Sequence, residues 1–376
     1  MNLELHLVQN FAPSNLNRDD TGSPKSCDFG GYRRARISSQ AIKRAIRKSN
    51  TFSETLGQEG AVRTRRLIAE IAERVAGEVP APSAVMTAVA DVFKAGGLER
   101  ASRREDEENT SILLYLAAPS IGRLADSVRS HLPELNKKSD DRSRILDAIG
   151  EELEESAKCP DVALFGRMIE VADTTPFGKR NLRVDAACQV AHPISTHQVA
   201  FDFDYFTAVD DLKPEGVTGA GMIGTVEFNS ACFYRYANID LGQLRKNLDG
   251  DTDLAATTVR AFLYASRDAI PTGKQNSFAA QNPPSFAFAV VRPSGFWSLA
   301  NAFVRPVRPR GDEDVVQLSV DALTRHWSDL STMYGVPSTR LAVCALKSLN
   351  VPEPLDAYRV DTYEALVQRV MSAIEA

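Results

Sequence analysis

The chain has 376 residues, of which 43% are hydrophobic and 25% charged, and its formal net charge is -5. This composition is ordinary for a globular protein that buries more than one core, and no apolar run approaches the roughly 18 residues of a membrane span. The five cysteines are scattered without a C-x-x-C pair. That pattern argues against a disulfide framework or a zinc knuckle and favours reduced thiols, so we expect a cytoplasmic protein with no membrane partner.

The first fifty residues predict a strand, a long basic loop and a short helix. Alternating leucines predict the strand at residues 3–9. The loop 10–37 is polar and long enough to be functional. The serine pair Ser38 and Ser39 can cap a helix that ends near Lys48.

Positive charge is concentrated in the same region. Residues 1–50 carry nine basic and four acidic side chains, a net charge of +5, so the remainder of the chain carries -10. A local positive field on an acidic protein predicts a polyanionic partner such as a phosphate chain. The basic residues that we expect to face it are Arg18, Lys25, Arg33, Arg34, Arg36, Lys43 and Arg47. The alternative, a solvated basic face beside a routinely capped helix, has about equal weight for an isolated cluster.

The rest of the chain alternates between helical and strand patterns. Helical periodicity dominates residues 59–158, and alternation typical of strands returns after residue 184. A helix is expected at about 252–268, strands at 285–291 and 340–346, and a last helix at 361–375. Without the helical block the order is strand, helix, strand, strand, helix, strand, which is the ferredoxin-like order that RNA-recognition domains also use. The predicted fold class is therefore α+β, with a ferredoxin-like, RRM-like palm and an inserted helical lobe.

Five sequence strings carry a resemblance to a known family. They are FGGYRRARISSQAIKRAIRKS (29–49), ALFGRM (163–168), DAACQVAHPISTHQV (185–199), FDYFTAVDD (203–211) and GTVEFNSACFYRYANID (224–240). In this order they resemble the CasC family, the backbone subunit of the Cascade complex of type I-E CRISPR systems. The resemblance implies a palm at 1–58 and 184–376, a thumb β-hairpin at about 195–225 and a helical fingers lobe at 59–183. It also implies a non-catalytic function, in which several copies hold one CRISPR RNA for pairing with a target DNA strand, beside other Cascade subunits.

The same resemblance implies particular RNA contacts. In the N-terminal region these are Arg18, Lys25, Ser38, Gln40, Lys43 and Arg47. Ser39 adds a polar group at the helix start. Met168 would pack against guide bases, although a core methionine is the simpler interpretation from composition alone. Tyr205, Phe206 and Thr207 would lie on the thumb, and because Tyr205 and Phe206 are adjacent on a strand, their side chains should point to opposite faces.

The main alternative function is an endoribonuclease of the same fold. His6, His192 and His197 could supply acid–base catalysis, but structural histidines are the preferred interpretation. Asp19 and Asp20 could bind Mg²⁺, but we expect them to pin the basic loop instead. No metal, cofactor or catalytic residue is predicted. Lys274 and Gln275 lie in a loop that could face RNA or could be an ordinary surface turn.

Overall fold

The computed structural model describes residues 1–57, 60–101, 109–131, 143–208, 222–336 and 338–375. It is an α+β structure built around an antiparallel sheet, which confirms the predicted fold class. The chain forms two compact units. The first holds residues Met1–Phe52, Gln189–Asn238 and Arg260–Ala376, and the second holds Ser53–Cys188 and Ile239–Val259.

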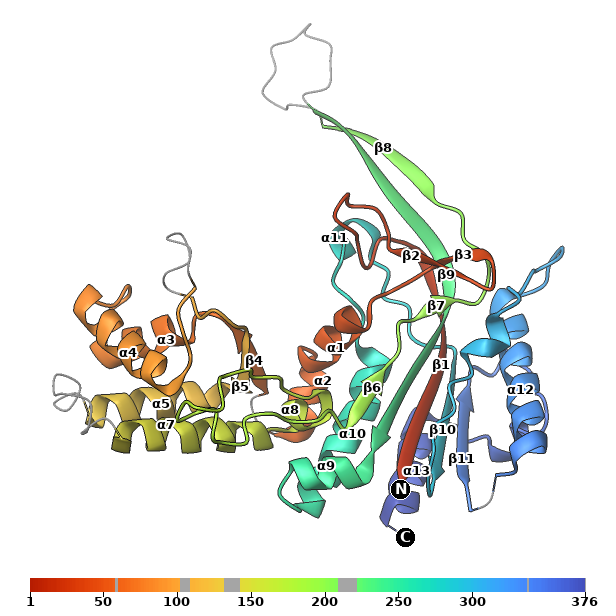
Figure 1. Cartoon of the computed structure of the whole chain (residues 1–376). Helices are drawn as coiled ribbons and strands as arrows, with labels where there is room; N and C mark the ends of the chain where they lie inside the picture. Colours follow the sequence, from red (N-terminus) through yellow and green to blue (C-terminus); the bar gives the residue numbers. More distant parts are fainter. Residues whose placement is uncertain (58–59, 102–108, 132–142, 209–221, 337, 376) are drawn as a thin grey trace, which may run out of the picture. The chain divides into compact units, whose positions relative to one another are not determined.

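The sheet of the first unit has the strand order β11-β10-β1-β9-β6, with β7 and β8 also paired to β9. The strands are β1 (Asn2–Ser14), β6 (Cys188–Val190), β7 (Ile194–Ser195), β8 (Asp202–Ala208), β9 (Met222–Asp240), β10 (Phe286–Arg292) and β11 (Arg340–Ala345). The four strands β10, β1, β9 and β6 lie in the order of a ferredoxin-like sheet, and β11 adds one strand at its edge. Figure 1 shows these strands with β1 near the centre.

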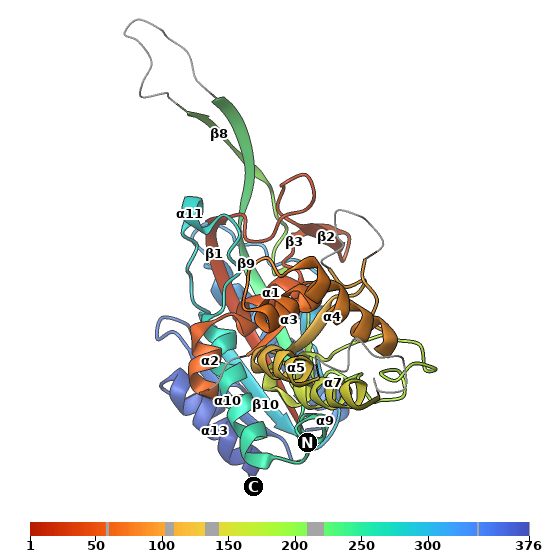
Figure 2. The ribbon, with the colours of Figure 1, turned by 90° about the vertical axis from the view of Figure 1, so that its left-hand side faces the viewer.

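Alternating side chains give the sheet two apolar faces because successive residues of a strand point to opposite sides. On one face, Phe288 meets Trp327 of α12 (Val315–Tyr334), with ring centroids 4.9 Å apart. On the other face, Leu5 and Leu7 lie beside Ile42 of α1 (Ser39–Arg47). Helix α10 (Thr252–Asp268) and helix α13 (Tyr363–Glu375) belong to the same layer as α1 (Figures 1 and 2).

The expected loop 10–37 contains a second small sheet. Strand β2 (Ser26–Phe29) pairs with β3 (Tyr32–Ala35) across the turn Gly30–Gly31, where both glycines have positive φ. A Cβ at Gly30 would lie 2.0 Å from the carbonyl oxygen of Val304. Protein backbone therefore occupies the space beside Gly30 that a side chain would need. Short elements complete the unit: α11 (Gln275–Phe278), η4 (Ala300–Phe303) and η5 (Asp356–Tyr358).

The second unit packs helices around a core of its own. Its strands are β4 (Ala61–Thr64) and β5 (Leu114–Ala117), and its helices are α3 (Leu67–Ala76), α4 (Ser83–Gly96), α5 (Ala118–Ser130), α7 (Ser143–Glu155), η3 (Ser156–Lys158), α8 (Pro160–Phe165) and α9 (Leu241–Asn247). Helix α2 (Asn50–Leu56) leads into it. The prediction had placed residues 239–259 in the palm. They join this unit because Asn247 of α9 donates to the carbonyl oxygens of Ala163 and Asp185.

Candidate nucleic-acid interface

A network of short hydrogen bonds holds the basic loop in place. The carboxylate of Asp19 accepts from the Thr21 hydroxyl at 2.7 Å and from the main-chain N–H groups of Thr21 and Ser23. The hydroxyl bond from Thr21, followed by these main-chain bonds, lowers the pKa of Asp19. Asn15 donates to the carbonyl oxygens of Gly22 and Glu227 and so ties the loop to β9. The prediction that Asp19 pins the loop is confirmed by these contacts.

The start of α1 is capped as the sequence predicted. The Ser38 side chain accepts from the N–H of Ala41 at 3.2 Å, and the Ser38 N–H donates to Asn17 at 2.7 Å. These bonds fix the helix start against the basic loop. Gln40 is exposed, Ser38 and Lys43 are half-buried, and Ser39 and Arg47 are mostly buried. The exposed polar surface at this helix start therefore comes mainly from Gln40 and Lys43.

Several cations converge beside this helix start, at His192. Nη1 of Arg36 lies 2.9 Å from Nδ1 of His192, which also accepts from the N–H of Ser39 at 3.3 Å. Partial burial and the charge of Arg36 lower the pKa of His192, and Lys25 and Lys43 act in the same direction. Lys25, Arg36 and Lys43 thus produce one positive region beside His192, as an anion site requires.

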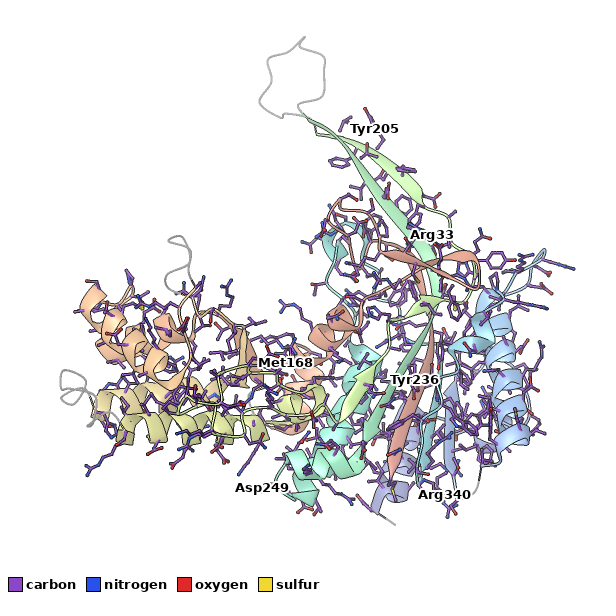
Figure 3. The ribbon with its side chains drawn as sticks, in the orientation of Figure 1. Arg33, Met168, Tyr205, Tyr236, Asp249 and Arg340 are labelled. Atoms are coloured by element: carbon purple, nitrogen blue, oxygen red, sulfur yellow. The ribbon has the colours of Figure 1, made fainter. Side chains whose placement is uncertain are left out.

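Arg34 corrects one of our predictions. Its side chain is fully buried, and its guanidinium donates to the carbonyl oxygens of Ser195 at 2.8 Å and Phe303 at 2.6 Å. A side chain enclosed in this way cannot reach a phosphate at the surface. Adjacent residues of a strand point to opposite sides, so the neighbouring Arg33 is exposed (Figure 3). We retain Arg33 as a candidate contact and remove Arg34.

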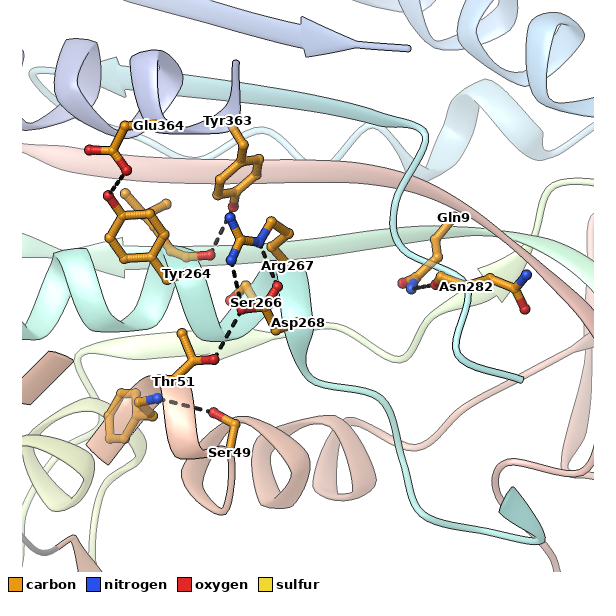
Figure 4. Close-up of polar contacts among 12 residues, drawn as sticks. Gln9, Ser49, Thr51, Tyr264, Ser266, Arg267, Asp268, Asn282, Tyr363 and Glu364 are labelled. Carbon is orange, nitrogen blue, oxygen red and sulfur yellow. Dashed lines mark hydrogen bonds and ion pairs between the residues drawn. The ribbon is translucent and has the colours of Figure 1, made fainter. Parts of the chain in front are cut away.

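A groove of about 850 Å³ runs between the basic loop, α1 and residues 268–273. Arg18, Arg44 and Lys48 line it, and the last two were not singled out from the sequence although they belong to the same basic run. Asp268 also lines the groove, but it is paired with Arg267 at 2.8 Å and accepts from Thr51 at 3.0 Å (Figure 4). Pairing offsets the negative charge of Asp268, while Asp19 and Asp20 also line the groove.

Strands β8 and β9 form a hairpin that projects from the sheet (Figures 1 and 2). Residues 209–221, including part of the expected thumb at 195–225, lie outside the described residues. Phe203 and Tyr205 lie on one face and are 65% and 67% exposed, while Phe206 points to the other face. The predicted opposite orientation of Tyr205 and Phe206 is confirmed, and Thr207 is exposed.

The two aromatic faces of this hairpin differ. Phe206 is paired with Gly224, and its ring covers the place that a side chain at Gly224 would fill. Phe203 stands opposite Glu227 and beside Tyr205 on the more exposed face. Phe203 was not predicted from the sequence as a site residue, yet its spacing of two from Tyr205 places both rings on one face.

Met168 lies on the surface of the second unit. It is 75% exposed, between Arg167 and Ile169, which are 4% and 3% exposed (Figure 3). Arg167 exchanges two main-chain hydrogen bonds with Val184, and its guanidinium donates to the carbonyl oxygen of Leu182. Burial lowers the pKa of Arg167 to about 10, which leaves it charged at neutral pH. Buried neighbours thus hold Met168 outward, and the alternative of a core methionine is wrong.

His6 and His197, two of the three histidines considered for catalysis, lie in structural positions, whereas His192 is exposed. His6 is completely buried, and its Nδ1 lies 2.8 Å from the hydroxyl of Tyr234. The Nε2 of His197 accepts from the N–H of Cys232 at 3.2 Å. In the parts of the chain that the structure describes, no group of three or more His, Cys, Asp or Glu side chains could hold a metal ion. Asp20 is exposed.

The loop that follows α10 joins the site from a distant part of the sequence. Lys274 lines a pocket with Arg18 and Phe203 at the base of the hairpin. The amide of Gln275 instead donates to the carbonyl oxygens of Pro271 and Ala280 and so closes the loop. Of the pair that the sequence suggested, Lys274 faces the site and Gln275 shapes it.

The fold and this surface together define a class: a ferredoxin-like α+β protein with a basic groove and a projecting aromatic hairpin. Residues 3–372 match the model of the family described as CT1975-like protein. The chain belongs to this family, which is a Cas family. No curated protein matches the chain. The described helices include none that is long and apolar enough to cross a membrane.

Solved structures give the same assignment. One chain from a "CRISPR RNA-guided surveillance complex, pre-nicking" is 31% identical, with a TM-score of 0.84, covering 99% of this chain and 100% of that chain. A second, from a "CRISPR RNA-guided surveillance complex", is 26% identical, with a TM-score of 0.73 and the same coverage. The similarity therefore extends over both units and includes the hairpin strands.

Proposed function

We propose that this chain is a guide-RNA-binding subunit of a CRISPR RNA-guided surveillance complex, of the type I-E Cascade kind. One observation carries the proposal: the convergence of Arg18, Lys25, Arg36 and Lys43 around the capped start of α1. The similar chains belong to complexes of this kind. A subunit that serves any guide must hold the sugar-phosphate chain and leave the bases unread.

The described contacts suit this task. The basic side chains of the groove supply charge without a fixed hydrogen-bond pattern for base edges. The exposed rings of Phe203 and Tyr205 offer stacking surfaces, which accept every base because every base has a π face. The guide would stay available to a target DNA strand, while neighbouring copies of the chain and other Cascade subunits complete the assembly.

Binding of a labelled single-stranded RNA tests the proposal. Lys43→Ala and Arg18→Ala should each weaken binding about equally for several unrelated RNA sequences. Each should also reduce the slope of log affinity against log salt by about one, because one phosphate contact is lost. Lys347→Ala, which removes an exposed charge at the far edge of the sheet, is the matched control. Losses that depend strongly on RNA sequence, or equal losses in the control, would contradict backbone binding.

The proposed subunit does not cleave RNA. The same labelled RNA, incubated with the protein with and without Mg²⁺, should remain intact. Site-specific cleavage that is lost in Asp20→Ala would instead favour the endoribonuclease, because Asp20 is exposed beside the basic groove. His6 is a poor candidate for that chemistry because its ring has no access to the surface.

A further inference from the structure

A strap of residues 169–184 follows the exposed Met168 and covers the helices of the second unit. The strap contains neither helix nor strand. Its apolar residues Ile169, Phe177 and Leu182 nevertheless belong to the core that α3, α4, α5 and α7 form. A segment without regular structure keeps one shape only where side chains anchor it, so its anchors decide where Met168 points.

The first anchor is the ring of Phe177. This side chain is completely buried, and its ring meets that of Phe93 of α4 edge to face, with centroids 6.4 Å apart. The Phe177 N–H donates to the carbonyl oxygen of Gly96 at 3.1 Å. A Cβ at Gly96 would lie 2.0 Å from the Phe177 ring, so the end of α4 receives this ring only because a glycine is there.

The second anchor is Arg180, which lies across α7. A Cβ at Gly150 would lie 2.3 Å from Nε of Arg180, so the guanidinium rests directly on the helix backbone. It forms ion pairs with Asp147 and Glu154, each at 3.0 Å. The N–H of Asn181 donates to Glu154 as well, at 3.2 Å. The strap is therefore held on both sides of Phe177.

The third anchor, Arg167, joins the end of the strap to the residue before Met168. Its Nε donates to the carbonyl oxygen of Leu182 at 2.9 Å, and its Nη1 donates to the Ser156 hydroxyl at 2.8 Å. The guanidinium is buried and makes no ion pair within the described parts of the chain. Burial of a cation without a counterion costs free energy that an apolar side chain would not. This cost indicates a task beyond packing.

We propose that Arg167 is a positioning residue for RNA binding, which directs Met168 toward a nucleobase. Arg167 and Val184 exchange two main-chain hydrogen bonds, each of 2.9 Å, so the chain is extended here and adjacent side chains point to opposite sides. With Arg167 fixed inward, Met168 is fixed outward. Its polarisable thioether suits contact with any base. This inference rests on the proposed function, since the base belongs to the bound RNA.

A double-mutant cycle on binding of a labelled single-stranded RNA tests the proposal. Met168→Ala should weaken binding about 2- to 10-fold, the range of a contact between sulfur and a ring. Arg167→Leu should weaken binding to a similar degree. The double variant should bind about as well as the weaker single variant, because Arg167 acts only through Met168. The salt slope should stay unchanged in all three variants, since no phosphate contact is lost.

The methyl resonance of Met168, assigned from its loss in Met168→Ala, reports the contact directly. RNA should shift this resonance in wild type, and Arg167→Leu should remove most of the shift. Arg180→Ala is a second variant that loosens the strap through partly exposed ion pairs and keeps the buried guanidinium of Arg167. It should also reduce the shift. Arg123→Ala, which breaks an ion pair between α5 and α7, is the matched control and should leave the shift unchanged.

The outcomes separate this inference from the proposed function. If the effects of Arg167→Leu and Met168→Ala multiply, or if Arg167→Leu lowers the salt slope, the positioning role is wrong while RNA binding stands. Unchanged affinity of Met168→Ala would also overturn it. An equal loss in Arg123→Ala would assign the effect to general loosening of the unit. If wild type binds no RNA, the proposed function fails as well. Should Arg167→Leu not fold, the cycle of Arg180→Ala with Met168→Ala decides.

Discussion

Two adjacent arginines of the β2–β3 hairpin have opposite environments. Arg34 donates to the carbonyl oxygens of Ser195, Phe303 and Val304, and it is fully buried. Arg34→Ala leaves these carbonyl groups without a donor, at roughly 1–3 kcal/mol for each one that water cannot reach. We expect a clearly lower melting temperature and a lower free energy of unfolding, measured by urea denaturation.

Arg33→Ala is the matched comparison because the side chain is exposed. It should change the melting temperature little and weaken RNA binding, with a smaller salt slope. The pair of variants thus separates support of the fold from contact with RNA. An Arg34→Ala protein as stable as wild type would show that its three hydrogen bonds contribute nothing net.

His6 should make the stability of the protein sensitive to acid. Burial lowers its pKa, although the neighbouring Glu4 acts to raise it and Arg292 acts to lower it further. The fold thus favours the neutral ring, whereas the unfolded chain takes up a proton below about pH 6.5. The stabilising contribution is fully present above that pH and is lost as the pH falls through the folded pKa.

Melting temperatures between pH 5.0 and 7.5 check this prediction. His6→Gln should reduce the decrease in melting temperature at acidic pH, since Gln keeps a polar group near Tyr234 but does not titrate in this range. An unchanged acid decrease in His6→Gln would assign the pH dependence to other groups.

For single residues, the sequence predicts which residue types form the charged surface better than it predicts where their side chains point. The basic run identified the charged surface, and Ser38 identified the helix cap correctly. The sequence could not show that the side chain of Arg34 points inward, because its acceptors at Phe303 and Val304 lie about 270 residues away along the chain. The groove residues Arg44 and Lys48 could have been predicted from the sequence, because they belong to the same basic run.

At the scale of elements, the projecting hairpin has two aromatic faces with different tasks. Phe206 covers Gly224, which has no side chain of its own to support the strand pair. Phe206→Ala should therefore destabilise the hairpin by roughly 0.2–1 kcal/mol, the range for cross-strand pairs. Faster hydrogen exchange in residues 202–208 and 224–228 would report this loss.

Tyr205→Ala is the counterpart on the exposed face. It should leave hydrogen exchange of the hairpin nearly unchanged and weaken RNA binding by roughly 1–3 kcal/mol if one base stacks on the ring. Equal effects of the two variants on exchange would contradict the division of the hairpin into a supporting and a binding face.

Helices and strands were predicted from periodicity, but the elements with which they pair or pack were not. The strand at 285–291 and the helix at 361–375 agree with β10 and α13. The β2–β3 hairpin was missed because its strands are only four residues long. Residues 239–259 lie in the second unit and not in the expected palm, and the hydrogen bonds of Asn247 to a distant part of the chain leave no local pattern in the sequence.

At the scale of the whole molecule, charge is distributed unevenly. Residues 1–50 carry +5 and the remainder carries -10. Under the proposed function, two copies bound side by side on one RNA would place the acidic remainder of one near the basic region of the next. Contacts between unlike surfaces do not close into a pair, so they continue for as long as the RNA allows.

We therefore expect the number of bound copies to increase with RNA length. Mass measurements on single complexes should show increments of one 41.1 kDa chain for each fixed added length of RNA. Lys43→Ala should lower the number of bound copies at every RNA length without changing the RNA length that each copy occupies. The variant weakens RNA binding, whereas contacts between copies set their spacing. Rising salt should shorten the arrays, since counterion release drives their assembly. A single copy per RNA at all lengths would mean that the chain binds RNA without forming an array.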